Sequence, residues 1–295
     1  LNLNKDKEEK TNALNRYASK IGIPINPPVF RYSKAQYFCN SETKSIYKGI
    51  GSLKYLNDMV ADELYYLKYR KFDSFIELLM TIKDETSLNS RQLDLLIRID
   101  FFEEFGCIGK LLKVTDVFNN VYDKTKKCFK KQMGKDKVEQ NGLSHETMKS
   151  YCHKETEKTY MQVDFYGLIK DIESHMQIPD ISDYEKASYQ QTILKHVSIV
   201  DKKYKGIAVV ASIDTKYSPK LSCFAMANGN TIECKIAKKT YNMKPLEEGD
   251  IIEIFDTMTK PRQQMNENGK WVEVPGTKVF WITGYKILFH QKKDK

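Results

Sequence analysis

Three stretches between residues 46 and 106 carry apolar side chains at spacings of three and four, the period of an amphipathic helix. A Ser74/Glu77 pair opens the second stretch in the arrangement of a capping box, and Ser87 and Asn89 precede the third. Helices this short are not stable alone in water, so we expect them to pack together as a compact helical unit. The apolar positions are Leu56, Met59, Val60, Leu64 and Leu67, then Phe75, Leu78, Leu79 and Ile82, then Leu93, Leu96, Ile97 and Phe101.

From Lys205 onward the pattern changes, and apolar and polar positions alternate as in β-strands. Two alternating runs flank Asn228-Gly229, a strong signal for a tight hairpin turn. A short helix and turn over 238–250 follow, then two further strands separated by a long loop from Thr257 to Thr277. The order of three strands, a helix and two strands is that of an OB-fold, a five-stranded barrel. The chain is therefore predicted to be an α+β multidomain protein.

The remaining segments predict simpler structure. Residues 1 to 20 have helical spacing, and Pro24, Pro27 and Pro28 then force an extended path. The run over 124–137 is strongly basic, which fits a mobile tether, a helix facing nucleic acid or an ordinary solvated surface. Between 107 and 203 we expect a helix that includes Leu111 to Tyr122 and ends near Met133-Gly134, a turn at Asn141-Gly142, a polar helix from Ser144 through Glu157 and another helix over 180–195.

The composition favours a polyanion partner and argues against a membrane span or a zinc site. The 295 residues carry a net charge of +9, with 41% hydrophobic and 29% charged residues, a pI of about 9.0 and a mean hydropathy of -0.56. Basic chains bind polyanions such as nucleic acid, although a basic surface also serves solubility alone. No apolar run approaches the ~20 residues of a membrane helix, so no membrane partner is expected. Six cysteines lie far apart, and with the histidines they fit no closed zinc motif, so we expect reduced thiols and no metal.

The sequence of the helical unit resembles the tandem helix-hairpin-helix region of bacterial and phage C-family replicative DNA polymerases, the DNA polymerase III alpha subunits. In that family the region reads roughly GIGAIKGVG, helix, F-x-x-F, LNRR-x-LE-x-LI-x-x-GAFD-x-LG. An extended segment before the helical unit also resembles the family, and its matching positions are Gly22, Ile23, Pro27, Pro28 and Ser33. The predicted barrel resembles the family's OB-fold domain at Ile232 and Glu233. The matching positions in the helical unit are Gly49, Ile50, Gly51, Leu53, Lys54, Phe75, Leu88, Asn89, Arg91, Leu93, Leu96, Ile97, Phe102 and Gly106.

This resemblance implies four regions. Residues 1–44 would be the end of a fingers domain, and 45–106 an all-α tandem helix-hairpin-helix-like unit. Residues 107–203 would be a basic helical linker that contains a sliding-clamp-binding motif, and 204–290 the OB-fold domain. Because the chain begins with Leu1 rather than Met, we expect it to be part of a longer protein.

The hairpins depart from the family pattern. A DNA-binding hairpin needs G-x-G so that backbone N–H groups can approach a phosphate, but the first one falls on Tyr55, Leu56 and Asn57 and the second on Asp100 and Phe101. Either Gly49 to Gly51 presents the backbone in a shifted register, or the unit only packs. The candidate DNA contacts of this unit are Lys48, Gly49, Gly51 and Lys54.

A second motif follows the helical unit. Residues 162–166, QVDFY, resemble the family's clamp-binding pentapeptide, Q-x-D-hydrophobic-F, although Tyr166 replaces the final Phe. Such a peptide places apolar side chains in a groove of its partner, and Gln162 would anchor it by hydrogen bonds. The candidate clamp-binding residues are Gln162, Asp164, Phe165 and Tyr166.

OB-fold barrels bind single strands through basic grooves and stacking aromatic side chains. Tyr217 and Trp271 lie among polar residues and are the better stacking candidates, whereas Phe224 is the weakest because half of the aromatics belong to the barrel core. The candidate single-strand-binding residues are Lys216, Tyr217, Lys220, Phe224, Lys235, Lys260, Arg262, Lys270 and Trp271.

Together these patterns predict a DNA-binding and clamp-binding region that positions duplex and single-stranded template for a replicative polymerase. The family's catalytic motif, P-D-x-D-x-D, is absent from the sequence, so we expect no nucleotidyl transfer and no cofactor in this chain, with Mg²⁺ only in the palm domain. The expected partners are single-stranded template, primer-template duplex, a sliding clamp and the rest of the polymerase, in the cytoplasm. The alternatives are a stand-alone OB-fold single-strand-binding or repair accessory protein, and an interaction scaffold.

Overall fold

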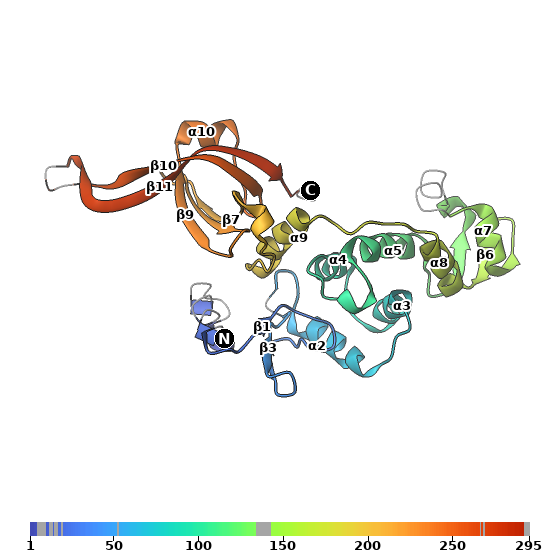
Figure 1. The fold of residues 1–295 in the computed structure, drawn as a ribbon. Coiled ribbons are helices and arrows are strands. Elements are labelled where there is room, and N and C mark those ends of the chain that lie inside the picture. Colours follow the sequence, from blue (N-terminus) through green and yellow to red (C-terminus); the bar gives the residue numbers. More distant parts are fainter. Residues whose placement is uncertain are drawn as a thin grey trace. The chain divides into compact units, whose positions relative to one another are not determined.

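The computed structural model describes Leu1 to Gln291 apart from residues 5–9, 12–13, 15–16, 19, 52, 134–142, 266 and 268. Half of the residues of the helix predicted over 1–20, and the predicted turn at Asn141-Gly142, therefore lie outside the described residues. The chain divides into two compact units, Leu1–Asp180 and Ile181–Lys295 (Figure 1). Both contain helices and strands, so the chain is mixed α and β, as predicted from the two kinds of hydrophobic period.

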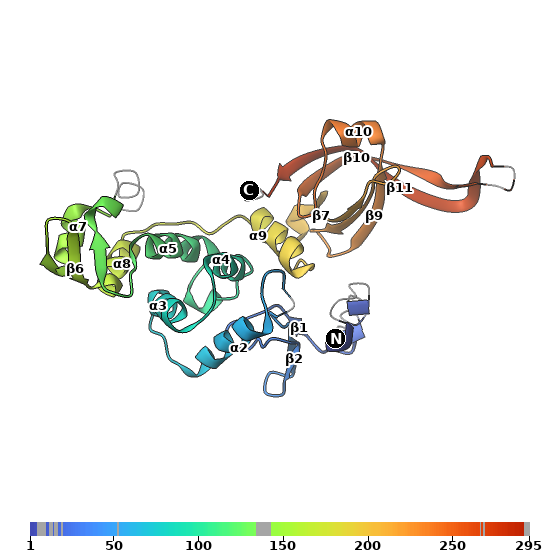
Figure 2. The same ribbon diagram turned by 180° about the vertical axis from the view of Figure 1, so that it is seen from behind.

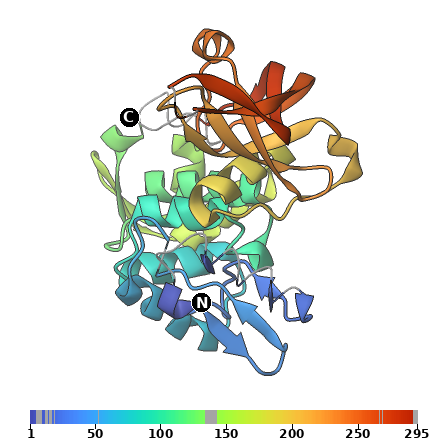
Figure 3. The same cartoon turned by 90° about the vertical axis from the view of Figure 1, so that its left-hand side faces the viewer.

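Unit 1 begins with a short 3-10 turn (Asn2–Asn4) and three short strands, drawn in blue in Figure 3. Strand β1 (Ile25–Asn26) pairs in parallel with β3 (Ser45–Tyr47), and β3 pairs antiparallel with β2 (Phe38–Asn40). Strand β3 lies within 45–106, so the prediction that this unit is all-α is wrong at its start, whereas β1 and β2 precede it in the segment predicted to be extended. The proline-rich segment keeps the backbone extended, and its carbonyls accept hydrogen bonds from residues near β3.

The three predicted helices are confirmed as α2 (Asp58–Tyr66), α3 (Phe75–Glu85) and α4 (Ser90–Arg98). Each begins at a side-chain cap, because Asn57, Ser74 and Asn89 accept hydrogen bonds from N–H groups of the first turn. Short 3-10 turns follow α2 (Leu67–Tyr69) and α4 (Glu103–Phe105), and α5 (Ile108–Val121) completes the bundle. The predicted apolar faces are largely buried: Leu64, Leu79 and Leu96 are at most 1% exposed.

Aromatic rings join the extended segment to the bundle. Phe30 is 1% exposed and lies within 6.5 Å, centroid to centroid, of Phe72, Phe101 and Phe102. Its backbone N–H also donates to the carbonyl of Phe101 at 2.8 Å. Burying a side chain of this size contributes about 1.5–3 kcal/mol, so the segment around Phe30 is an integral part of unit 1.

A small lobe follows α5 at one end of unit 1 (Figures 1 and 2). Strand β4 (Lys127–Phe129) and β5 (Cys152–Glu155) flank β6 (Thr159–Val163), and all pairings are antiparallel. A 3-10 turn (Lys130–Gln132), α7 (His145–Ser150) and α8 (Phe165–Ser174) complete the lobe.

Three predictions for this region are wrong. The helix predicted to end near Met133-Gly134 ends at Val121, and β4 follows it. The segment 107–203 is not a helical linker, and the helix that Ser144 caps ends at Ser150 instead of continuing through Glu157. The reason lies in residues 152–163, where Tyr160 and Val163 are 1% exposed and are buried through strand pairing rather than on a helix face. Thr156 closes the turn between β5 and β6 by hydrogen bonds with Thr159.

Unit 2 begins with α9 (Asp183–Tyr189), a π-helical turn (Gln190–Leu194) and a 3-10 turn (Lys202–Tyr204). This matches the helix predicted over 180–195. Five strands then close a barrel in the order β10-β11-β9-β8-β7, with β10 also paired to β7. The strands are β7 (Ile207–Asp214), β8 (Lys220–Ala225), β9 (Thr231–Ile236), β10 (Ile251–Met265) and β11 (Trp271–Phe289), with α10 (Lys238–Met243) between β9 and β10.

The barrel core is formed by side chains that alternate along the strands. Val210, Cys223, Ile236, Ile252 and Ile282 are fully buried within it. Beyond the barrel, β10 and β11 continue together as a two-stranded ribbon (Figure 1). The long loop predicted from Thr257 to Thr277 is therefore wrong, because Thr257 to Met265 pairs with Trp271 to Ile282 across most of its length.

Candidate nucleic-acid interface

One row of paired residues crosses the outer surface of the barrel. Lys220 on β8 pairs with Asp214 on β7 and with Lys235 on β9. Lys235 pairs with Trp281 on β11, and Trp281 pairs with Met258 on β10. Paired residues project from the same face of a sheet, so these five side chains form one band, which we call the lysine-tryptophan row.

The row faces outward because its sequence neighbours face inward. Leu221, Cys234 and Ile282, each next to a member of the row, are at most 4% exposed in the barrel core. Side chains alternate between the two faces of a strand, so Lys220, Lys235 and Trp281 point away from that core.

Two ammonium groups lie near the Trp281 ring. The Nζ of Lys235 is 5.6 Å from the ring centroid and the Nζ of Lys260, on β10, is 5.2 Å from it. Cations at these distances are attracted to the indole face by about 0.5–1 kcal/mol each at exposed sites. The arrangement combines a half-buried ring with two positive charges, the pair of features that a base and its neighbouring phosphates require.

The first barrel loop adds a second aromatic group. Tyr217 is 72% exposed between β7 and β8, as expected for a stacking residue, and the Nζ of Lys216 is 5.7 Å from its ring. The backbone N–H of Lys216 donates to Asp214 at 3.0 Å, so the start of this loop is held to the end of β7. Phe224, by contrast, packs against the cluster around Val209 and Met226, in agreement with its place as the weakest candidate.

The ribbon carries the remaining candidates. Arg262 is exposed, its backbone N–H donates to Thr277 at 2.9 Å, and it pairs with Val274. Lys270 is exposed next to the ribbon end, where the backbone of Trp271 pairs with Met265; the Trp271 side chain lies outside the described part of the structure. Lys260 lies close to the Trp281 ring. Arg262 and Lys270 are not part of the lysine-tryptophan row.

Trp281 and Met258 are members of the row that the sequence candidates omitted. The sequence carried a signal for Trp281, because it lies between two apolar residues, Phe280 and Ile282, that both pack in the barrel core. Strict alternation then places Trp281 outside. Carboxylates limit the basic surface: Asp214 ends the row, and Glu233 pairs with Ser222 two positions away from it.

In unit 1, Gly49 and Gly51 are explained by packing. A Cβ at Gly49 would lie 2.4 Å from the Gln36 carbonyl carbon, and one at Gly51 would lie 2.9 Å from the Ala35 oxygen. The N–H groups of Ile50 and Gly51 donate to the carbonyls of Lys34 and Ala35. These two amides are therefore occupied by the chain itself, which favours the packing alternative over a phosphate site at this loop.

The two positions where the family has its hairpins still adopt a glycine-like backbone. Tyr55 has φ 71° and Asp100 has φ 65°, a region that non-glycine residues enter uncommonly. Gln92 on α4 donates to the carbonyl of Tyr55 at 2.7 Å, which fixes the first turn. Each of these two residues thus has a backbone conformation that glycine favours, although neither is glycine.

A basic cluster surrounds Tyr55. The guanidinium carbon of Arg91 is 3.7 Å from the Tyr55 ring centroid and the Nζ of Lys54 is 4.9 Å from it. A hydrogen bond from Lys54, together with the positive charge of Arg91, lowers the pKa of the Tyr55 hydroxyl. Lys48 is half-buried beside β3. Arg91 matches the family pattern but was not among the candidate contacts, since its side chain meets the turn only in three dimensions.

The QVDFY segment is folded into the small lobe. Gln162 lies in β6 with φ 53°, Asp164 caps α8 by accepting from Gly167, and Phe165 is 3% exposed. The Phe165 ring is 5.7 Å from that of Tyr122. Tyr166 is half-buried on α8. In this conformation Phe165 cannot enter a partner's groove, so clamp binding by this segment stays a prediction that requires local unfolding.

Within the described residues, no group of three or more histidine, cysteine, aspartate or glutamate side chains could hold a metal ion. A search for long apolar helices in the same part of the chain finds none that could cross a membrane. Comparison with protein-family models and with curated proteins finds no match to this chain.

Proposed function

We propose that this chain binds nucleic acid and that its barrel binds a single strand across the lysine-tryptophan row. The observation that carries the proposal is the placement of Trp281 between Lys235 and Lys260 on the outer face of the barrel. Stacking of one base on an aromatic side chain contributes ~1–3 kcal/mol, and neighbouring lysines release counterions from the backbone. Tyr217 offers a second ring at the first loop.

The barrel topology supports an OB-fold assignment. Strands β7, β8 and β9 form a meander, β9 pairs in parallel with β11, and β10 closes the barrel against β7. Helix α10 lies between β9 and β10. In OB-folds the face of the second and third strands and the adjoining loops contact oligonucleotides, and here these elements are β8, β9 and the ribbon of β10 and β11.

We further propose that the chain is a DNA-binding region of a C-family replicative polymerase, which places template and primer-template duplex for synthesis elsewhere. Support comes from the sequence resemblance and from two features of unit 1: the succession of α2, α3 and α4 in the expected places, and the left-handed residues Tyr55 and Asp100 at the expected hairpins. Lys54 and Arg91 are the basic side chains at the first hairpin. The sequence contains no P-D-x-D-x-D motif, so this function is binding without nucleotidyl transfer.

A stand-alone single-strand-binding or repair accessory protein is the second candidate. It is favoured by the compactness of unit 2, which has its own core and contains the whole lysine-tryptophan row. The two candidates differ in one observation. A P-D-x-D-x-D segment encoded upstream in the same reading frame supports the polymerase, whereas a complete reading frame without it supports the accessory protein.

Fluorescence anisotropy of labelled oligonucleotides, titrated with the full chain at several salt concentrations, tests nucleic-acid binding. Single-stranded, duplex and primed substrates are compared, with the wild type beside Tyr217→Ala and Trp281→Ala. We expect single-strand binding that weakens steeply with salt and with loss of either ring. Tight duplex binding that neither substitution changes would assign nucleic-acid binding to unit 1 instead of the barrel. No binding at low salt would refute the proposal.

A further inference from the structure

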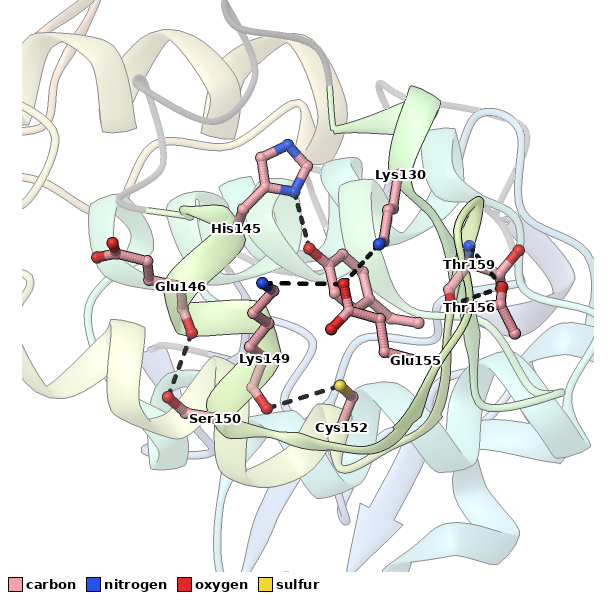
Figure 4. Close-up of polar contacts among 10 residues, drawn as sticks. Lys130, His145, Glu146, Lys149, Ser150, Cys152, Glu155, Thr156 and Thr159 are labelled. Carbon is pink, nitrogen blue, oxygen red and sulfur yellow. Dashed lines mark hydrogen bonds and ion pairs between the residues drawn. The ribbon is translucent and has the colours of Figure 1, made fainter.

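The three-stranded sheet of the small lobe has one covered face and one open face. On the covered face, Cys128 and Tyr160 are a cross-strand pair and are 4% and 1% exposed. Met148 on α7, also buried, is part of the same lobe core. Helix α7 therefore covers one side of β4, β6 and β5, as Figure 4 shows.

Charges on the covered face are paired with one another. The Glu155 carboxylate accepts a hydrogen bond from Lys130 at 2.5 Å and lies 3.9 Å from Lys149 (Figure 4). The Lys130 hydrogen bond and charge lower the pKa of Glu155. On the same side, His145 Nδ1 is 2.9 Å from the Tyr160 hydroxyl. The lysines of this face thus have partners within the lobe.

The open face is basic and carries an exposed ring. Lys127 on β4 and Lys154 on β5 both pair with Met161 on β6, so the three side chains form one row across the sheet. Phe129, two residues after Lys127 and therefore on the same face, is 45% exposed. Both lysines are exposed and form no ion pair with a described residue, although Lys127 lowers the pKa of Asp123 by its charge.

Further exposed lysines lie in the turns next to β4 and β6. With strands about 4.8 Å apart, Lys127 and Lys154 start roughly 10 Å from each other on either side of Met161. A flat sheet with flanking cations and an exposed ring offers contacts both to phosphates and to the face of a base. Other exposed lysines of the lobe are Lys124, Lys126, Lys131 and Lys158.

We propose that the open face of the β4-β6-β5 sheet is a second binding site for a single-stranded nucleic acid, separate from the barrel. Lys127 and Lys154 contact the phosphate backbone, and Phe129 stacks on a base beside them. The occupant is a nucleic acid rather than an apolar protein surface, because the row has a positive charge at each end and a single half-buried thioether, Met161, between them. This site lies in unit 1 and does not depend on the proposed role of Trp281.

The test measures single-strand binding by the full chain in a Trp281→Ala background, so that the barrel contribution is reduced. The double variant Lys127→Ala/Lys154→Ala is compared with Lys20→Ala/Lys83→Ala, which removes the same charge from exposed positions elsewhere in unit 1. We expect the slope of log K against log salt to fall in magnitude by about 1.4 for the first pair, at about 0.7 per lost phosphate contact. The control pair leaves the slope unchanged.

A photo-crosslinking amino acid at position 129 provides a direct readout that does not depend on affinity. We expect cross-links to a single-stranded oligonucleotide that disappear at high salt and in Lys127→Ala/Lys154→Ala. Equal slopes for the two lysine pairs together with no cross-link would overturn the site. Cross-links to duplex alone would overturn the single-strand assignment. If the cross-links are retained but Trp281→Ala alone does not weaken single-strand binding, only the barrel proposal is rejected.

Discussion

Lys235 and Trp281 are direct neighbours across the parallel pairing of β9 and β11, with the ammonium nitrogen 5.6 Å from the indole centroid. The two strands are separated in the sequence by α10 and β10. Barrel closure therefore assembles the site, and neither residue alone would predict it. The contact places a positive charge and an aromatic ring side by side on the outer face of the sheet, as the proposed single-strand site requires.

Replacing the Trp281 ring tests the stacking role. We expect Trp281→Ala to weaken single-strand binding by about 1–3 kcal/mol, because the surface on which a base stacks is lost. Trp281→Phe keeps an aromatic face and should retain most of the affinity. Anisotropy titration at fixed salt measures both variants.

Intrinsic fluorescence gives an independent check, since the two tryptophans of the chain, Trp271 and Trp281, both lie in unit 2. Stacking should quench the emission of Trp281 in a Trp271→Phe variant when a single strand is added. Equal affinities for Trp281→Ala and the wild type, with no quenching, would contradict a stacking function for this residue.

The lysines of the row make a separate prediction about salt. Each phosphate contact contributes about 0.7 to the slope of log K against log salt for single strands, so Lys220→Ala/Lys235→Ala should lower the slope by about 1.4. Lys239→Ala, at an exposed position on α10 outside the row, is the control and should change it little. A fall in affinity with an unchanged slope would mean that the two lysines support the structure of the barrel rather than contact phosphates.

The sequence predicted the helices and the barrel strands because their signals are local. Ser74 and Asn89 mark helix starts by side-chain caps, and Asn228-Gly229 marks the turn between β8 and β9. Tyr217 was recognised as exposed for the same reason, since the residues around it are polar. These features depend on a few neighbouring residues and need no knowledge of the fold.

The parts that were missed depend on distant residues. The row of Lys220, Lys235 and Trp281 joins three strands, and the Tyr55 cluster needs Arg91 from another helix. Residues 152–157 are polar enough to suggest a helix surface, yet Cys152–Glu155 is a strand that pairs with β6, where Tyr160 is buried. Tertiary pairing decided the structure there against the local pattern.

The burial of Phe165 leads to a stability prediction. Phe165 is 3% exposed and its ring lies 5.7 Å from that of Tyr122, so Phe165→Ala should lower the free energy of unfolding of unit 1 by about 3–5 kcal/mol. Tyr166→Ala, at the next and more exposed position, should have a much smaller effect. Urea unfolding followed by circular dichroism at 222 nm measures the difference. If Phe165→Ala were as stable as the wild type, the segment would be free to act as a docking peptide.

Tyr122 anchors the end of α5 through a carboxylate. Its hydroxyl donates to Asp84 Oδ2 at 2.9 Å, and no described group bonds the buried Asp84 Oδ1. Burial, followed by the Asp84 hydrogen bond, raises the pKa of Tyr122 to about 12 from an ordinary value of 10.0. Tyr122→Phe should keep the ring stack on Phe118 and remove only the hydrogen bond, at a cost of about 1.5–3 kcal/mol for a bond to a charged group.

The sign of the pH dependence follows from the direction of that shift. A tyrosine whose pKa is raised on folding stabilises the folded state fully below the unfolded pKa of 10.0, and the contribution is lost as the pH rises toward about 12. The stability difference between wild type and Tyr122→Phe should therefore be constant from pH 7 to 9 and shrink between pH 10 and 12. The other tyrosines of the chain are present in both proteins, so their titration cancels in this difference. A difference that instead grew with pH would show that the Tyr122 hydroxyl is not held in its neutral form by burial and Asp84.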